Sequence, residues 1–331
     1  MPLVDLDVVF LGTSGSAPTA RRAPAATLIR RGGERLLIDC GEGTQRQLLR
    51  SDIGLVDLEH VLITHYHADH YLGLPGMLKT FALRGRETPL TIYGPAGLRR
   101  LLDDLRRVFG RLTYPLETVE LGAGEAVARD GYAVIPFPVT HGVPALGYAL
   151  VEEMRPGRFD AALADGLGVP HGPERGALQR GETVTLADGT RIAPDQLLGP
   201  ARPGRTVVLT GDTGPAASVV EAAQGADVLV HEATFCADER ERARETGHTT
   251  AGEAALAARE AGVRLLALTH LSSRYHGPDV EAEARQLFPE AVVPRDFDVI
   301  DVPFAERGGP ALVVRGARAS RPQGNGGAAA S

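Results

Sequence analysis

The sequence predicts an α/β layered fold. Short apolar runs alternate with segments of helical spacing along most of the 331 residues, and this alternation is typical of sheets covered by helices. Hydrophobic residues make up 43% of the chain and charged residues 23%, so the chain can bury a full core. Several apolar runs end on a histidine or an aspartate. Because active sites in α/β sheets gather beyond the carboxyl ends of the strands, this pattern also predicts where a site lies.

The first third of the chain supplies strands and helices in turn. Apolar or alternating runs predict the strands, and a GGE turn between two of them predicts a hairpin. Helical spacing predicts the helices, one of which starts at a Pro-Ala pair. We expect strands at 5–12, 60–64 and 90–94, a hairpin over 25–40, and helices over 41–51, 72–83 and 95–109.

Three further apolar runs occur late in the chain, at 206–212, 227–235 and 264–270. Each contains or ends on a polar residue capable of metal binding or acid–base chemistry. A helix is predicted over 249–262, with Thr249 as a plausible N-cap and Gly262 as the stop.

Residues 152–205, called the arm below, are different in composition. They are rich in Gly, Pro and charged residues, with seven Arg and eight acidic residues, and their short segments are typical of turns. The stretch is too long for an ordinary loop, which indicates that it is either functional or mobile. Residues 316–331 have the composition of a disordered tail.

The overall composition excludes some classes of protein. The net charge of −7 does not suggest a nucleic-acid binder, because such domains are often strongly basic. The sequence has no apolar run of about 18 residues, so no membrane span is expected, and the first residues do not have the pattern of a secretory signal. Cys40 and Cys236 lie far apart, and although a single disulfide is conceivable, two reduced thiols in the cytoplasm are the better interpretation.

The strongest motif is an HxHxDH pattern that follows the apolar run at 60–64. It places His65, His67, Asp69 and His70 within six residues on a predicted loop. Imidazole and carboxylate are ligands that suit zinc and related divalent ions. The alternative is a solvated polar loop without a metal. The apolar strand before the motif argues against it, because four costly polar groups would then stand at the end of that strand without a function. The motif therefore predicts a metal site.

The motif resembles the metallo-β-lactamase superfamily, which adds a later His, Asp and His to HxHxDH. Those positions correspond to His141 in FPVTHG, Asp212 in LTGDTG and His270 in LLALTH. The resemblance implies an αβ/βα four-layer sandwich with two metals at the sheet edge. FLGTSGSAPT, LLIDCGEGTQRQL, HEATF, GHTT and LSSRY narrow it to the ribonuclease Z family, the tRNA 3′-processing endonucleases. The arm is similar to that family's protruding flexible exosite, inserted in a hydrolase domain of residues 1–315.

The resemblance also assigns ligands and substrate contacts. It implies that His65, His67 and His141 bind one Zn²⁺, that Asp69, His70 and His270 bind the other, and that Asp212 bridges both. A metal-activated hydroxide would then attack the phosphodiester of precursor tRNA and leave a 3′ hydroxyl on the tRNA. Arg274 in the SRY segment could bind a phosphate, and Gly172 and Pro173 in the arm would contact the substrate. Family members are homodimers in which one subunit's arm reaches tRNA at the other subunit's site.

Two residues are candidates for proton transfer. The family match makes His248 the general acid for the leaving ribose oxygen, with Glu232 holding it charged, because a neighbouring carboxylate keeps an imidazole protonated. From the residues alone, the better interpretation is that His248 only caps the helix expected at Thr249, and the family match reverses this preference. Asp69 could orient or deprotonate the attacking water, or act only as a ligand.

Other interpretations remain open on the sequence alone. The PTARRA segment at 18–23 lacks the Asn that family members commonly carry in this loop. A cluster of arginines on or beside the helix at 95–109 is either a solvated face, which is the commoner arrangement, or a track for RNA backbone. The alternative functions are a small-molecule phosphodiesterase or arylsulfatase-like hydrolase, which would not need the arm, and a metal-stabilised RNA-binding protein, which would not need a general acid.

Overall fold

The computed structural model describes residues 4–55 and 58–314. They form two compact units. The large unit contains residues 135–149 together with the described residues before 127 and after 206, and the small unit contains Val127–Val134 and Leu150–Thr206. The predicted tail at 316–331 lies outside the described residues.

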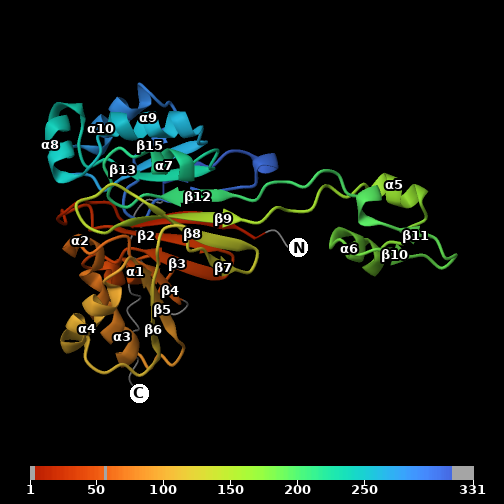
Figure 1. The fold of residues 1–331 in the computed structure, drawn as a ribbon, viewed down its shortest axis with the longest axis horizontal. Coiled ribbons are helices and arrows are strands. Elements are labelled where there is room, and N and C mark those ends of the chain that lie inside the picture. Colours follow the sequence, from red (N-terminus) through yellow and green to blue (C-terminus); the bar gives the residue numbers. More distant parts are fainter. Residues whose placement is uncertain (1–3, 56–57, 315–331) are drawn as a thin grey trace, which may run out of the picture. The chain divides into compact units, whose positions relative to one another are not determined.

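The first sheet has eight strands and is built mainly from the N-terminal third of the chain (Figure 1). Its strands pair antiparallel from β17 to β3 and parallel from β3 to β6. In spatial order they are β17 (Ala311–Val313), β16 (Val299–Asp301), β1 (Leu6–Gly12), β2 (Ala26–Arg31), β3 (Glu34–Ile38), β4 (His60–Leu62), β5 (Leu90–Gly94) and β6 (Leu116–Glu120).

The second sheet has seven strands. The four that come last in the chain, β12 to β15, run parallel to one another. In spatial order its strands are β15 (Ala291–Val292), β14 (Leu265–Thr269), β13 (Val228–Glu232), β12 (Thr206–Leu209), β9 (Leu146–Glu152), β8 (Tyr132–Pro138) and β7 (Val127–Arg129).

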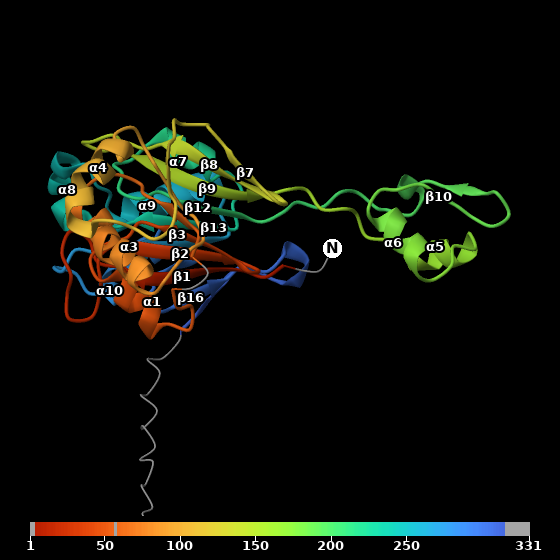
Figure 2. The same ribbon diagram turned by 90° about the horizontal axis from the view of Figure 1, so that it is seen from below.

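Helices cover the outer face of each sheet (Figures 1 and 2). On the first sheet α1 packs against β1 and α4 against β6, and on the second α9 packs against β13 and β14 and α10 against β15. This is the expected four-layer αβ/βα sandwich. The helices of the large unit are α1 (Thr44–Arg50), α2 (Ala68–Tyr71), α3 (Gly73–Leu83), α4 (Leu98–Phe109), α7 (Ala217–Ala222), α8 (Arg240–Thr246), α9 (Ala251–Ala261) and α10 (Gly277–Arg285), with short 3₁₀ turns η2 (Ala237–Glu239) and η3 (Ala305–Arg307).

The predicted elements are all present, and most differ only at their ends. Strand β5 has the predicted bounds. Strands β4, β12 and β14 end before the His or Asp that follows them, and β13 ends on Glu232, three residues earlier than predicted. The prediction of Thr249 as the N-cap of α9 is wrong. Thr250 is the N-cap, because its hydroxyl accepts from the Glu253 amide while the Glu253 carboxylate accepts from the Thr250 amide. Thr249 instead donates its hydroxyl to the Thr213 carbonyl.

The arm is more ordered than its turn-rich composition suggests. It contains α5 (Ala161–Gly166), α6 (Pro173–Gln179), a hairpin of β10 (Val184–Thr185) and β11 (Arg191–Ile192), and the 3₁₀ turn η1 (Pro194–Gln196). These elements enclose a small core of Ala164, Val169, Leu178, Val184, Ile192 and Leu197. The apolar side chains are spread over short elements, so no periodic run in the sequence reveals them.

Candidate metal centre

Every predicted ligand follows a strand. The HxHxDH residues lie on the loop after β4 and on the one-turn helix α2, and His141 follows β8. Asp212 follows β12, and His270 is the residue directly after β14. All seven belong to the large unit. Because strands β4, β12 and β14 bring their carboxyl ends to this region, residues up to 205 positions apart in the chain meet there.

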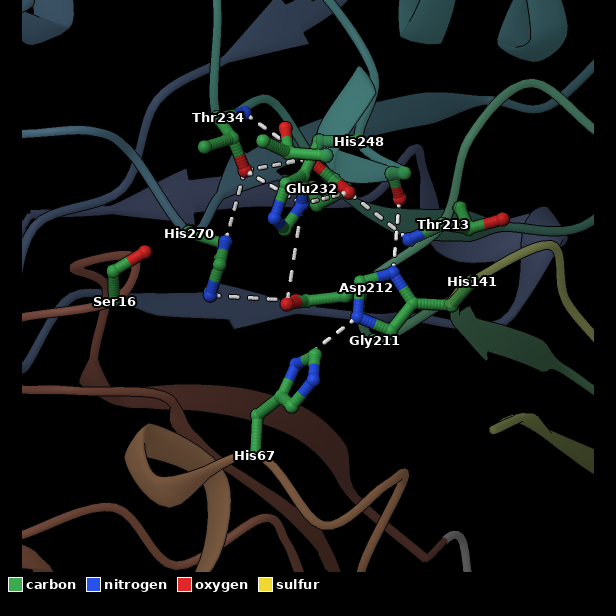
Figure 3. Close-up of polar contacts among 12 residues, drawn as sticks. Ser16, His67, His141, Gly211, Asp212, Thr213, Glu232, Thr234, His248 and His270 are labelled. Atoms are coloured by element: carbon green, nitrogen blue, oxygen red, sulfur yellow. Dashed lines mark hydrogen bonds and ion pairs between the residues drawn. The ribbon is translucent and has the colours of Figure 1, made fainter. Parts of the chain in front are cut away.

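The first group of ligands consists of His65, His67, His141 and Asp212, whose ligand atoms lie within 4.8 Å of one another. His141 Nε2 lies 3.1 Å from His67 Nδ1, and His65 Nε2 lies 3.7 Å from Asp212 Oδ2. Figure 3 shows the rings of His67 and His141 turned towards each other beside Asp212.

The second group consists of Asp69, His70 and His270, whose ligand atoms also lie within 4.8 Å of one another. His270 Nε2 lies 3.2 Å from Asp69 Oδ2 and 3.3 Å from His70 Nε2. Burial alone would raise the pKa of Asp69, but the His270 hydrogen bond and the charge of His70 hold that pKa well below its usual value. Asp69 is therefore a carboxylate that can bind a cation.

Asp212 lies between the two groups. Its Oδ2 atom is 3.4 Å from His70 Nε2, and its Oδ1 atom is 3.3 Å from His270 Nε2. The side chain is 3% exposed. Burial acts to raise its pKa, but the surrounding imidazoles hold the pKa well below its ordinary value. A single carboxylate thus faces both groups.

Two buried polar atoms show that these residues fit a metal. His65 Nε2 and Asp212 Oδ1 are fully buried, yet neither makes a hydrogen bond within the described part of the chain. Buried polar atoms are normally satisfied, so such orphaned atoms need an explanation. Burial and the neighbouring imidazoles lower the pKa of His65 to about 2, which keeps its ring neutral and able to donate a lone pair. Divalent metal ions held by the two groups would satisfy both atoms.

Hydrogen bonds on the far side of each ring orient the imidazoles. His70 Nδ1 donates to Asp39 Oδ2 at 2.7 Å, and His141 Nδ1 donates to the Gly247 carbonyl at 2.9 Å. His270 Nδ1 lies 2.9 Å from the hydroxyl of Thr234. Each bond fixes the tautomer that leaves Nε2 free to face a metal.

Sequence reasoning missed these orienting residues, although Asp39, Thr234 and Gly247 all lie inside or directly beside motifs that it used. The Asp39 carboxylate also accepts from the amide of Thr64 at 2.8 Å and from its hydroxyl. The Thr64 hydroxyl lies 3.1 Å from His65 Nδ1, which holds a second ring in the same way. Their proximity to the imidazoles arises only from tertiary folding.

The buried Glu232 and the half-buried His248 form a hydrogen-bonded pair beside the metal groups (Figure 3). His248 Nδ1 lies 2.8 Å from Glu232 Oε1. Glu232 also accepts the amides of Thr213 and Thr234 and the Thr234 hydroxyl. Burial disfavours the charged imidazole, but the hydrogen bond and charge of Glu232 raise the pKa of His248 to about 9. The pair therefore exists as imidazolium and carboxylate at neutral pH.

The loop after β1 closes one side of the centre. The amide of Ser16 donates to Asp69 Oδ2 at 2.8 Å, and Ser16 has a left-handed φ of 59°. Gly15 packs so closely on His270 that an added Cβ would lie 2.7 Å from its carbonyl oxygen and 2.8 Å from its ring nitrogen Nδ1. Only glycine fits at this position without moving the ligand.

The remaining predicted substrate contacts lie outside this cluster. Arg274 is exposed and its guanidinium pairs with Glu239 at 3.1 Å. Gly172 is the N-cap of α6 and Pro173 is its first residue, and both are exposed on the small unit.

Comparison with known proteins identifies the family. A family profile described as the metallo-beta-lactamase superfamily matches residues 20–186, and one described as a beta-lactamase superfamily domain matches residues 171–271. Ribonuclease Z of Methanosarcina acetivorans is 44% identical over 303 residues, which cover 90% of this chain and 99% of that protein. Ribonuclease Z of Myxococcus xanthus is 51% identical over 271 residues, covering 82% and 88%. The chain belongs to the ribonuclease Z family.

Solved structures agree with this placement. The short form of human tRNase Z is 27% identical, with a TM-score of 0.65 over 90% of this chain and 100% of that chain. The metallo-beta-lactamase fold protein YhfI from Bacillus subtilis has a TM-score of 0.66 at 21% identity, covering 90% and 99%, and shows the shared fold. The predicted family and the metallo-β-lactamase-type sandwich are thus confirmed. No helix in the described ranges is long and apolar enough to cross a membrane.

Proposed function

We propose that the chain is a metal-dependent endoribonuclease that removes the 3′ trailer from precursor tRNA and leaves a 3′ hydroxyl on the tRNA. Its membership of the ribonuclease Z family supports this activity. The observation that carries the mechanism is the position of Asp212 between two groups of ligand atoms, with the Glu232–His248 pair alongside.

The proposal assigns a zinc ion to each group, giving two per subunit. His65, His67 and His141 would hold one and Asp69, His70 and His270 the other, with Asp212 shared between them. The ligand set of imidazoles and carboxylates is one that zinc prefers. When bound, the metals acidify a water molecule and offset negative charge on the phosphate.

The protein's own groups position and protonate the reacting atoms. Asp69, fixed by the Ser16 amide, would orient the attacking water or accept its proton. His248, charged through its contact with Glu232, would donate a proton to the ribose oxygen that leaves. The buried Glu232 carboxylate, which accepts four hydrogen bonds from Thr213, Thr234 and His248, supports this role, because it favours the protonated imidazole.

Substrate contacts and assembly complete the proposal. Gly172 and Pro173 would contact the tRNA body, and Arg274 would bind a phosphate after exchanging its ion pair with Glu239. We expect a homodimer in which the arm of one subunit serves the site of the other, as the family resemblance implies. The two unpaired cysteines, Cys40 and Cys236, support a location in the reducing cytoplasm.

The decisive experiment uses zinc-loaded protein and a precursor tRNA that lacks an encoded CCA sequence. Mapping both product ends should place the cut next to the discriminator nucleotide. His67→Asn should abolish cleavage, whereas His276→Asn, which alters an exposed histidine at the start of α10, should not. Failure to cut the precursor, combined with rapid hydrolysis of a small phosphodiester, would replace the proposal with the alternative of a small-molecule phosphodiesterase.

A second experiment tests the arm. The backbones of Arg155 and Arg202 pair with each other through two hydrogen bonds, so residues 158–199 can be replaced by a short Gly-Ser turn beyond that pair. Cleavage of precursor tRNA should fall much more than hydrolysis of a small diester. Equal losses on the two substrates would rule out a substrate-holding role.

A further inference from the structure

A groove of about 830 Å³ lies between α4, the loop that follows it, and β6. Arg99 and Arg106 line it from α4, and Arg111 lines it from the loop. Its apolar floor includes Phe109 and Tyr114, both of which are buried. The function described above makes no use of this groove.

The arginines of the groove are free to bind an anion. All three are exposed, and none of their guanidinium groups makes a hydrogen bond or ion pair within residues 4–55 and 58–314. Asp103 is the one acidic residue that lines the groove. Glu120, on β6, uses its carboxylate to accept the amides of Gly97 and Arg99 at the start of α4. The groove therefore has a net positive charge on a chain whose total charge is −7.

The start of α4 touches the metal-binding loop. Tyr66, between His65 and His67, donates its hydroxyl to the Pro95 carbonyl, and its ring packs over Gly97, the N-cap of α4. Arg99 lies two residues into the helix, and Arg106 is seven residues further on, which is about 10 Å along the helix axis. The line of arginines thus begins at the end of α4 that contacts the HxHxDH loop and continues along the helix towards its other end.

We propose that this groove holds the single-stranded 3′ trailer of the precursor through its phosphodiester backbone, an inference that rests on the proposed function. A guanidinium fork suits a phosphate, and positively charged grooves that track the backbone are the usual means of binding single strands. The groove has the volume of a small-ligand pocket, so a short stretch of single strand fits it and a tRNA stem does not. Because Phe109 and Tyr114 are buried, the bases have no exposed ring to stack on, and binding is tolerant of trailer sequence.

The test compares two double variants of the same helix that remove the same charge. Arg99→Gln with Arg106→Gln alters the groove, and Arg100→Gln with Arg107→Gln alters exposed arginines that do not line it. Each is assayed on a precursor with a long trailer and on one with a single trailer nucleotide. The groove variant should raise KM for the long trailer roughly tenfold and lower the salt slope of binding by about 1.4, with kcat unchanged. In the groove variant, KM for the short trailer should stay the same. In the control variant, KM for both trailer lengths should stay the same.

Other results overturn the inference. An equal rise in KM for both trailer lengths would show that the groove binds the tRNA body. An equal rise in KM in the two variants would show that only the total positive charge of the helix matters, and not the groove. Fluorescence anisotropy of a labelled single-stranded RNA of trailer length gives a readout that does not depend on cleavage, and unchanged affinity in the groove variant would also refute the proposal. Failure of the proposed function is seen separately, because the unaltered protein would then cut neither precursor.

Discussion

Asp39→Asn should weaken metal binding without straining the backbone. Asp39 Oδ1 accepts from the amide of Thr64, Oδ2 accepts from His70 Nδ1, and the Thr64 hydroxyl lies between the two oxygens, at 3.0 Å from Oδ1 and 2.9 Å from Oδ2. The amide oxygen of an asparagine would stay with Thr64, so its NH₂ group would face His70. It would donate to Nδ1 and drive the ring proton to Nε2, the atom that faces the second ligand group. Asp39 has a φ of 59°, a conformation that asparagine tolerates as well as aspartate, so backbone strain is not introduced.

The size of the effect follows from the role of such outer partners. Losing one typically costs 10- to 100-fold in metal affinity, or about 1.4–2.7 kcal/mol. Zinc affinity is measured by competition with a chromophoric chelator, and cleavage of precursor tRNA is measured at limiting and saturating zinc. The loss of activity should be greatest at limiting zinc.

Asp227→Asn is the matched control. Asp227 is also buried and paired, with Arg264 at 2.8 Å, but it precedes β13, whose far end carries Glu232. The two positions are five residues apart along extended chain, which corresponds to about 16 Å. This variant should lose stability and keep its zinc affinity. If Asp39→Asn binds zinc as tightly as the unaltered protein, or if the control loses as much, the tautomer argument is wrong.

Three further predictions concern the acid, the loop and the metals. Glu232→Gln removes the charge that raises the pKa of His248 to about 9. Because the proposed acid donates from its protonated form, the alkaline limb of the kcat–pH profile should move to lower pH, and an unmoved limb would exclude His248 as the acid. Gly15→Ala places a methyl group 2.7 Å from the His270 carbonyl and should cost roughly 100-fold in kcat, as a displacement of about 1 Å can, whereas Gly33→Ala, which meets no atom within 4 Å, should be silent. Dialysis against a chelator should abolish cleavage and lower Tm, because a ligand present at 1,000 times its Kd stabilises the folded state by about 4 kcal/mol. An unchanged Tm would argue against metals bound at the two groups.

The sequence alone was sufficient to predict the candidate residues whose chemistry is visible in a short motif. HxHxDH names four ligand positions by itself, and apolar runs that end on His or Asp mark where the strands end. Strands β4, β12 and β14 are shorter than predicted because the residues after them leave the sheet to present their side chains. The motifs that resemble the family then supplied His141, Asp212 and His270.

The residues that orient the ligands could not be predicted in this way. Asp39 lies 31 residues from His70, and Thr234 lies 36 residues from His270. Neither residue is itself a candidate metal ligand. Each contacts the ring nitrogen of a histidine that faces away from the metal groups. Their role depends on which strands neighbour one another, a property of the sheet topology that no local pattern encodes. The core of the arm was missed for a related reason, since its apolar residues belong to several short elements.

Backbone strain at the centre explains why the site depends on so much of the large unit. Ser16, Asp39 and His270 are three of the four non-glycine residues with positive φ in the described ranges. A left-handed residue costs about 1–2 kcal/mol, and such residues persist only when their surroundings determine them. Here each strained residue has a defined contact: Ser16 through its amide to Asp69, Asp39 through its carboxylate to His70, and His270 through its ring to Thr234. The folding energy of two sheets thus holds the ligands in place before any metal binds, and a substitution that relaxes one of these backbones is expected to affect the metal centre before it affects the fold.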